Sequence, residues 1–291
     1  MSSIVLGSSF FASTADSPRE DILKEYIGFL EHRNGGLDFE KGFANRDRWS
    51  READGAKIRH RGQISEEEFK KNFAQFQFGE GMTLKAIALL AFTKVNAGEA
   101  YGVEVVTRHR LGHPPTGETV DRLERILGHE EVYHTKILLG ATEQFGLARP
   151  TEGWKPYFPL RVLIGSLAYV PTAIFHPILL AAEFGGVFAF NWLLSKVGEV
   201  FADEPELKES MEARLIEVLV DEVGHITFNR MMVGPLGLEI ARTLAPHVAD
   251  GTSGFTPEFR ALGWNKDTIK AFDKFDFSIL PEEVKKRAFL A

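Results

Sequence analysis

Two short stretches of the chain repeat the pattern Glu-x-x-His, at residues 131–134 and 222–225. If each stretch is helical, its carboxylate and its imidazole lie one turn apart on the same face of the helix. Such groups are costly to bury in a protein core unless something compensates them, and in helical bundles a pair of metal ions is a common compensation. The repeated pattern therefore indicates metal chemistry.

Both stretches lie where core-facing apolar residues are expected. At steps of three and four residues, one face of residues 119–145 carries Leu123, Leu127, Glu131, His134, Leu138, Ala141 and Phe145. The same spacing in residues 205–232 aligns Met211, Leu215, Val218, Glu222, His225, Asn229 and Met232. Because the apolar face of a helix turns toward the core, both Glu and both His are predicted to be buried.

Two further segments each offer one carboxylate. Glu99 lies on the apolar stripe of residues 82–109, whereas Glu104 lies off that stripe and is expected to be exposed. Glu183 is the only acidic residue in the apolar run 162–194. Glu99 and Glu183 therefore complete a candidate set of six side chains.

The spacing of the four glutamates supports this set. Glu99 precedes Glu131 by 32 residues, and Glu183 precedes Glu222 by 39. Intervals of this size bring residues of two neighbouring antiparallel helices to the same height. Four carboxylates and two imidazoles that converge in this way suit two iron or manganese ions better than zinc.

The elements that must position these side chains are all helical, because no alternating strand pattern is present. Long helices are predicted at residues 18–31, 65–76, 82–109, 119–145, 177–200 and 205–232, with shorter ones near 236–244 and 281–288. Ser65 and Glu68 form a capping box at the start of the second of these. Residues 32–62 read as a polar, glycine-containing stretch.

The sequence shows no internal repeat and no linker, so a single domain over residues 1–291 is expected. Its bundle core would cover about residues 82–232, with helical extensions at 1–81 and 233–291. The run 162–194 is long enough to cross a bilayer. Pro171, Pro177 and Glu183 interrupt it, however, which favours a buried helical hairpin over a membrane span.

The composition of the chain limits the classes of partner and cofactor that it is expected to bind. The net charge of −7 and the absence of a basic cluster argue against nucleic acid and anionic lipid. A chain without cysteine forms no disulfide, iron–sulfur cluster, zinc ribbon or thiolate nucleophile. Any electrons for redox chemistry must then come from the substrate or a separate reductase. Residues 1–16 lack the positive region of a signal peptide, so a cytoplasmic protein is expected.

Glu99, Glu131-x-x-His134, Glu183 and Glu222-x-x-His225, in this order, closely resemble the ligand pattern of the ferritin-like dimetal carboxylate superfamily. Enzymes of this superfamily activate dioxygen with two irons in a four-helix bundle. The resemblance covers roughly residues 82–232. It implies a ferritin-like four-helix bundle with additional N- and C-terminal helices, and a cofactor of two Fe ions or a Mn/Fe pair.

The resemblance also implies a role for each ligand. One metal would have Glu99 and His134 as terminal ligands, the other would have Glu183 and His225, and Glu131 and Glu222 would bridge them. The acid that precedes each Glu-x-x-His pattern would hold the imidazole of the opposite one. Asp221 would thus bond to His134 and Glu130 to His225, the alternative being that both acids are half-exposed helix charges.

Individual residues separate the branches of the superfamily. Leu138 stands where ribonucleotide reductase small subunits carry a radical tyrosine, and the four-cysteine iron site of rubrerythrins is impossible here. Storage ferritins usually lack the second histidine, which is His225 in this chain. Arylamine N-oxygenases have a third histidine where Val218 stands. His176 is then either a buried hydrogen-bonded residue or a different extra ligand, and Tyr133 is expected to pack off the ligand face.

These comparisons leave an O2-dependent oxidoreductase, a diiron monooxygenase or oxidase that acts on a small apolar or aromatic organic molecule. Phe175, Phe184, Phe188 and Phe190 either wall a substrate channel or simply pack in the core. A ferredoxin or flavin reductase would supply electrons, and a homodimer is left open. Two alternatives remain: a ferroxidase or peroxide-scavenging protein without organic substrate, and a metal-free helical interaction bundle.

Overall fold

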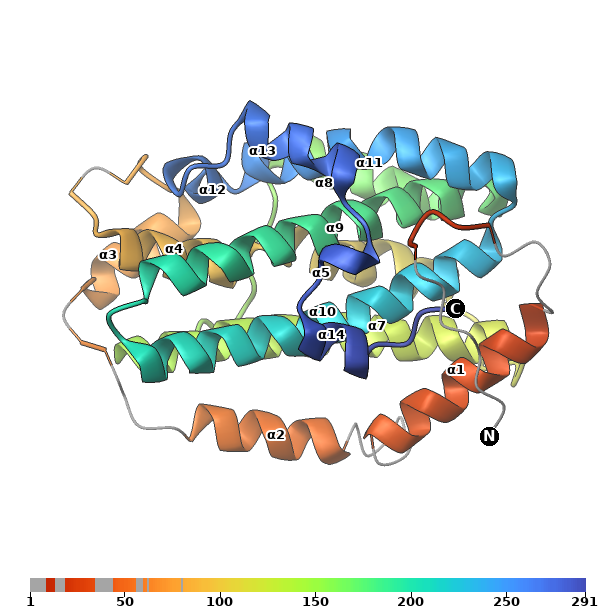
Figure 1. Ribbon diagram of the computed structural model, residues 1–291, viewed down its shortest axis with the longest axis horizontal. Coiled ribbons are helices and arrows are strands. Elements are labelled where there is room, and N and C mark those ends of the chain that lie inside the picture. The colour runs from red at the N-terminus through yellow and green to blue at the C-terminus, as the bar shows by residue number, and fades with distance from the viewer. Residues whose placement is uncertain (1–8, 14–18, 35–43, 56–59, 62, 80) are drawn as a thin grey trace.

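The computed structural model describes residues 9–13, 19–34, 44–55, 60–61, 63–79 and 81–291. Every regular element in these ranges is a helix, which confirms the all-α prediction (Figure 1). The predicted start at Pro18 and much of the stretch 32–62 lie outside the described residues, as does most of the segment 1–16.

Five helices form the centre of the molecule, and all but the first of them carry predicted metal ligands (Figure 1). They are α4 (Leu84–Lys94), α5 (Ala97–Gly102), α7 (Thr119–Gly140), α9 (Thr172–Val200) and α10 (Pro205–Met232). The two longest, α9 and α10, run antiparallel and pack along each other, while α7 packs against α10 and α5. Their apolar faces form one large core, as the spacing of apolar residues predicts.

The predicted helix over residues 82–109 is broken, which corrects the sequence prediction. After α4 and α5 the backbone widens into a five-residue π-helix, η1 (Val103–Thr107), and ends in the short α6 (Arg108–Arg110). The break between α4 and α5 falls at Asn96, whose side-chain Nδ2 donates to the carbonyl of Glu131 at 3.2 Å and to Thr135 Oγ1 at 3.1 Å. Asn96 thus ties the start of α5 to α7. Irregular turns of this kind are frequent at functional sites.

Other boundaries agree more closely with the sequence. The helix α10 has the predicted bounds, and α1 spans Arg19–Asn34. At the start of α3 (Glu66–Ala74), both hydrogen bonds of the predicted capping box are present. The helix predicted at 119–145 consists of two elements: α7 ends at Gly140, and the 3-10 helix η2 (Ala141–Phe145) covers the remaining residues.

The sequence analysis missed the short helices at 258–261 and 266–270 and two longer helices. The first longer helix is α2 (Ala44–Asp54), which lies within the stretch interpreted as polar and glycine-containing. The second is α8 (Phe158–Ser166), which continues into the 3-10 helix η3 (Leu167–Tyr169). Neither helix presents an apolar stripe buried in the core, so neither has the periodicity that identifies helices in a sequence.

The apolar helix α9 begins five residues earlier than predicted and contains Pro177 in its second turn. It alone among the described helices is long and apolar enough to cross a membrane, yet 67% of its most apolar window is buried inside the protein. The cover comes from α10, from α11 (Pro235–Phe255), which packs along part of the outer side, and from the segments after α11, whose Phe259 and Phe272 contact Trp192 and Phe188 of α9 (Figure 1). A Cβ on Gly185 would lie 3.1 Å from the backbone nitrogen of Ala249, so this glycine permits the close approach.

The remaining C-terminal elements are short and close the core. They are α12 (Glu258–Ala261), α13 (Lys266–Lys270), η4 (Ala271–Lys274), η5 (Phe277–Ile279) and α14 (Glu282–Arg287). The helix predicted near 236–244 is longer than expected, because α11 continues through Pro246 to Phe255. The helix predicted at 281–288 is α14.

Candidate metal centre

Three helices bring four of the predicted ligands into one buried group. Glu131 of α7, Glu183 of α9, and Glu222 and His225 of α10 each offer one ligand atom, and these atoms all lie within 4.8 Å of one another. All four residues are buried. The structure therefore contains a carboxylate and imidazole cluster that could hold a metal ion.

His134 lies directly beside this group. Its Nδ1 is 3.0 Å from Glu222 Oε1 and 3.4 Å from Glu131 Oε2, and its ring centroid is 5.7 Å from that of His225. The two Glu-x-x-His patterns thus face each other across the interface of α7 and α10. This is the arrangement predicted from their positions on the apolar faces.

Glu99 approaches from α5. Burial raises its pKa well above the ordinary value, and the negative charges of Glu222, Glu131 and Glu183 raise it further. A Cβ on Gly186 would lie only 2.5 Å from Glu99 Oε1, so the glycine one turn after Glu183 leaves the space that the Glu99 carboxylate fills. The structure thus brings all six predicted residues to one place.

Each imidazole is held by a carboxylate on the side away from the cluster. His134 Nε2 lies 2.9 Å from Asp221 Oδ2, and His225 Nε2 lies 3.2 Å from Glu130 Oε2. These contacts confirm the predicted partners, and because Asp221 and Glu130 are fully buried, the alternative of half-exposed charges is excluded. The contacts turn both Nδ1 atoms toward the carboxylates, as an outer carboxylate does for a metal-ligating histidine.

Arg46 connects the two outer carboxylates and was not found by the sequence analysis. Its guanidinium lies 3.2 Å from Glu130 Oε1 and also contacts Asp221 Oδ2. Arg33 of α1 makes a second contact to Asp221. Arg46 belongs to the missed helix α2, and nothing in the spacing of polar residues there distinguishes it from a surface arginine.

The two arginines and His134 lower the pKa of the outer carboxylate Asp221. Burial alone would raise the pKa of Asp221, but Arg33, Arg46 and His134 hold it well below its ordinary value. Burial would likewise lower the pKa of His134, yet Glu131 and the contacts to Asp221 and Glu222 raise it well above the ordinary value. The imidazoles thus take up protons to balance the carboxylates, and a bound cation would displace those protons.

Six buried polar atoms of the cluster have no hydrogen-bond partner among the described residues. They are Glu99 Oε2, Glu131 Oε2, His134 Nδ1, Glu183 Oε2 and both carboxylate oxygens of Glu222. An unsatisfied buried polar group costs about 1–3 kcal/mol, and more when it is charged. Oxygen and imidazole nitrogen atoms left free on facing side chains fit a metal site, since these are the donors that iron and manganese accept.

His176 lies outside the group of ligands. Its Nδ1 is 3.3 Å from Asn229 Oδ1, and Asn229 Nδ2 donates to Glu183 Oε1 at 3.3 Å. His176 is therefore a buried hydrogen-bonded residue that reaches the cluster through Asn229. Asn229 was noted only as part of the apolar stripe, and its position one turn after His225 is the signal that could have identified it.

Tyr133 also behaves as predicted, because it points away from the ligands. Its hydroxyl donates to the backbone carbonyl of Arg46, and the Arg46 guanidinium lies 4.7 Å from its ring centroid. Tyr133 thereby holds α2 in place.

The four phenylalanines of α9 are buried in the core. The rings of Phe184 and Phe11 are tilted with centroids 4.6 Å apart, and the ring centroids of Phe188 and Phe272 are 5.0 Å apart. These contacts are those of aromatic packing, so packing accounts for Phe184 and Phe188 without a channel.

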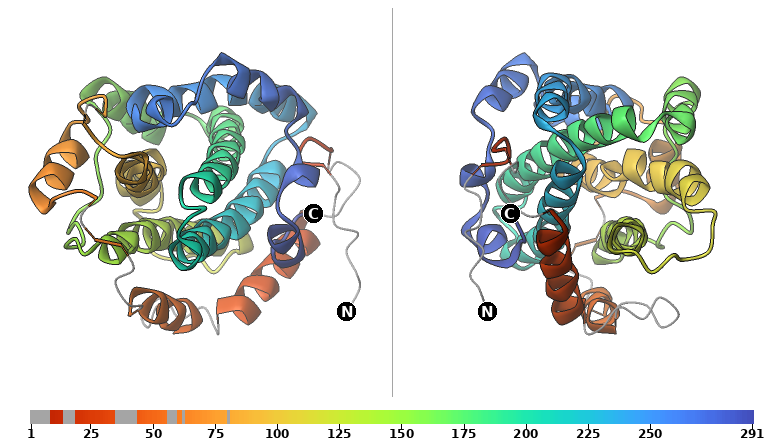
Figure 2. Two further views of the ribbon diagram at one scale, coloured as in Figure 1. Left: turned by 60° about the vertical axis from the view of Figure 1, so that its left-hand side comes forward. Right: turned by 90° about the vertical axis from the view of Figure 1, so that its right-hand side faces the viewer.

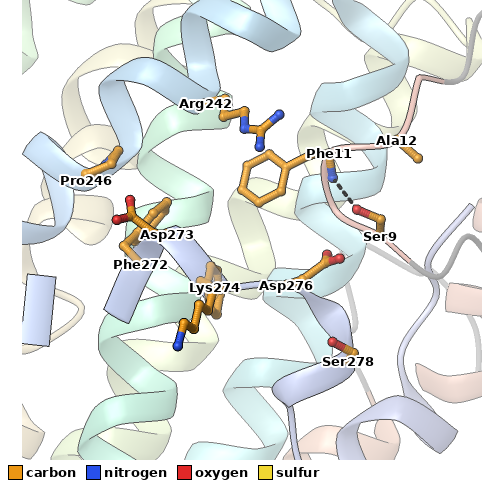
Figure 3. Close-up of a pocket in the computed structure, with 11 residues that line it drawn as sticks. Ser9, Phe11, Ala12, Arg242, Pro246, Phe272, Asp273, Lys274, Asp276 and Ser278 are labelled. Atoms are coloured by element: carbon orange, nitrogen blue, oxygen red, sulfur yellow. Dashed lines mark hydrogen bonds between the residues drawn. The ribbon is translucent and has the colours of Figure 1, made fainter. Parts of the chain in front are cut away.

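A pocket of about 570 Å³ lies elsewhere, between the N-terminal segment, α11 and η4 (Figure 3). The Arg242 guanidinium projects over the ring of Phe11 there, at 5.3 Å from its centroid (Figure 3). None of the six cluster residues lines this pocket.

Comparison of the chain with protein-family models, with characterised proteins and with solved structures finds no match. The functional interpretation therefore depends on the geometry of the site.

Proposed function

We propose that this protein is a non-haem diiron oxygenase or oxidase with a ferritin-like bundle, in which the six cluster residues hold two iron ions. The observation that carries the proposal is the set of buried donor atoms without hydrogen bonds on four helical segments. In a metal-free bundle four buried carboxylates would face only two imidazoles, and the six atoms without hydrogen bonds would cost several kcal/mol.

The distances support the division of the ligands between two metals. Glu131 places Oε2 at 3.4 Å from His134 Nδ1 and Oε1 at 3.0 Å from His225 Nδ1. Glu222 does the same, with Oε1 at 3.0 Å from His134 Nδ1 and Oε2 at 3.4 Å from His225 Nδ1. Because each of these two glutamates offers one oxygen to either imidazole, both suit a bridging role.

Glu183 and Glu99 complete the two halves. Glu183 Oε2 lies 3.8 Å from His225 Nδ1, and the charge of His134 acts on Glu99. In this arrangement Glu183 pairs with His225 at one metal and Glu99 pairs with His134 at the other. A manganese ion in one of the two positions is compatible with the same donors.

The chain itself contributes positioning and protection. Asp221 and Glu130 fix the tautomer and the direction of the imidazoles, and Arg46 contacts both outer carboxylates. When bound, two irons supply the electrons with which O2 is activated. The buried surroundings exclude bulk water from the reacting groups. The substrate class that we propose is a small apolar or aromatic molecule, with electrons delivered by an external reductase.

Measurement of O2 consumption by the Fe(II)-loaded protein tests this proposal. We expect one rapid turnover per pair of irons, with iron retained by the protein and with product formed from aromatic or apolar substrates under a supplied reductant. The Glu131→Ala variant should lose this reaction, whereas Glu104→Ala, which removes an exposed carboxylate near Glu99, should retain it. Equal O2 consumption by wild type and Glu131→Ala would refute the proposal.

A ferroxidase or peroxide scavenger is the second candidate, and the packing of α9 favours it. Phe184 and Phe188 contact other aromatic rings, which leaves these two positions without a role in binding an organic substrate. The two functions differ in the fate of iron during repeated Fe(II) addition. Release of ferric mineral, without oxidation of any organic compound, would identify the ferroxidase.

A further inference from the structure

The segment α8–η3, residues 158–169, lies at the periphery of the molecule (Figure 2), and several of its apolar side chains are exposed. None of its residues is fully buried, and Arg161 is its only charged residue. Phe158 is 68% exposed, Leu163 is 62% exposed and Tyr169 is 78% exposed. A soluble monomer rarely exposes a large contiguous apolar patch, and such patches mark interaction sites.

We call the exposed apolar surface of this segment and its flanks the α8 face. It consists of the exposed large apolar residues Tyr157, Phe158, Val162, Leu163, Tyr169 and Ile174. Three of these side chains are aromatic, and a fully buried aromatic side chain covers about 150–250 Å². The α8 face therefore offers apolar area on the order of several hundred Å², close to the roughly 800 Å² per partner that a stable interface needs.

The opposite side of α8 is anchored to the protein. It packs against α5 and η1, and a Cβ on Gly102 would lie 3.9 Å from Ile164 Cγ2. Beyond η3, Arg110 donates to the Val170 carbonyl at 2.9 Å and to Thr172 Oγ1 at 3.1 Å. Since one side of α8 is held in place and the other is uncovered, the α8 face is presented in a fixed geometry.

We infer that the α8 face binds the same face of a second copy of this chain, in a dimer with two-fold symmetry. Its composition is that of a protein interface, in which Tyr, Phe and Arg are enriched and Lys, Asp and Glu are depleted. A two-fold dimer needs a surface that is complementary to itself, and an apolar helix face can pack against its own copy.

The charge of the protein disfavours a membrane as the occupant. Interfacial helices that bind anionic bilayers carry several Lys or Arg residues, whereas residues 158–169 contain only Arg161. Of the neighbouring basic residues of α6, Arg110 is held by Val170 and Thr172, and His109 lies against the Tyr169 ring. The net charge of −7 also opposes approach to such a surface. Dimerisation by the α8 face is independent of the proposed metal chemistry.

Sedimentation velocity on the full chain tests this inference. We expect wild type to sediment with twice the chain mass of 32.5 kDa. The double variant Phe158→Ser/Leu163→Ser should raise the dimer dissociation constant about a hundredfold, because it removes two central apolar anchors. The matched control Leu236→Ser/Ile240→Ser changes two exposed apolar residues of α11 and should stay dimeric. Circular dichroism and metal content report on folding and on the cluster in each variant.

The absence of cysteine allows a second, direct test, because one introduced cysteine is then the only thiol in the chain. Val162→Cys should give covalent dimers with a short bismaleimide, whereas Leu236→Cys should give none. A wild type that stays monomeric, or a dimer that the α8 double variant leaves intact, would overturn the inference. A monomer that floats with phosphatidylglycerol vesicles would overturn it in favour of a lipid surface.

Discussion

Two regions of the core bury charged side chains, and they differ in how far other side chains compensate those charges. Near α4, the buried Lys94 places Nζ 2.5 Å from Glu258 Oε1 and 2.6 Å from the Asn72 carbonyl, so the protein supplies the compensating charge. At the cluster, four glutamates converge on two histidines, and six polar atoms make no hydrogen bond among the described residues. In the first region one cation faces one carboxylate and only Glu258 Oε2 lacks a hydrogen bond, whereas the second has more carboxylates than cations and the donor atoms of a metal site.

The largest expected effect comes from removal of a bridging carboxylate. We expect Glu131→Ala and Glu222→Ala each to reduce iron from about two per chain to less than one, because each removes a ligand from both metals. Inductively coupled plasma mass spectrometry on desalted protein measures this. The exposed Glu209→Ala on α10 is the matched control and should keep the full content. Two retained metals in either bridging variant would show that the bridge has been misassigned.

A substitution in the Lys94–Glu258 pair should change the stability of the protein and leave its metal content unchanged. Lys94→Met leaves Glu258 buried without its partner, so we expect the free energy of unfolding to fall by about 3–5 kcal/mol. Urea unfolding measures the loss, and the double variant Lys94→Met/Glu258→Gln should recover part of it. If the single and double variants unfold alike, Lys94 does not compensate the charge of Glu258.

Arg46 shares features of both regions: it is a buried cation that pairs with carboxylates, and those carboxylates hold the imidazoles of the cluster. We expect Arg46→Met to weaken iron binding by about 10–100-fold, the usual cost of losing an outer partner of a metal ligand. Anaerobic titration with Fe(II) measures the affinity. Arg46→Lys keeps one positive charge but not the two-pronged contact, and it should lie between Met and wild type. Unchanged affinity in both variants would limit Arg46 to a structural role.

The smallest effect is expected for Glu183→Gln in chelator-treated protein. There the free energy of unfolding should rise, whereas Lys94→Met should lower it. The change removes one of several mutually repelling buried carboxylates, so we expect a gain of about 0.5–2 kcal/mol, as for other relieved functional sites. With saturating Fe(II) the order should reverse, because binding stabilises wild type more. Thermal unfolding with and without metal checks both parts, and a variant less stable than wild type in both would contradict them.

The sequence was most informative where polar residues interrupt an apolar stripe. Two glutamates and both histidines could be assigned because the period of α7 and α10 places each on a core face, and Glu99 and Glu183 followed from the apolar stripes and the order of the other two segments. The contacts of Asp221 and Glu130 followed from the resemblance to known dimetal proteins. The finer assignment to a ferritin-like diiron enzyme remains a proposal.

What the sequence could not predict depends on tertiary contacts. The break at Asn96 arises from its hydrogen bonds to α7, which no local preference encodes. Arg46 reaches the site from α2, a polar helix that has no apolar stripe and is held by Tyr133 and by ion pairs. The helix α8 is apolar on its exposed side, so its sequence resembles that of a buried helix. For this reason α8 could not be separated from the apolar run that continues into α9.

The central claim is that the cluster is a metal site, and metal content per chain tests it most directly. Protein produced with iron and purified without chelator should contain close to two irons, or one iron and one manganese. After chelation it should take up two Fe(II) anaerobically and release protons from the imidazoles. No metal in the purified protein, together with no uptake of Fe(II) or Mn(II), would contradict the claim.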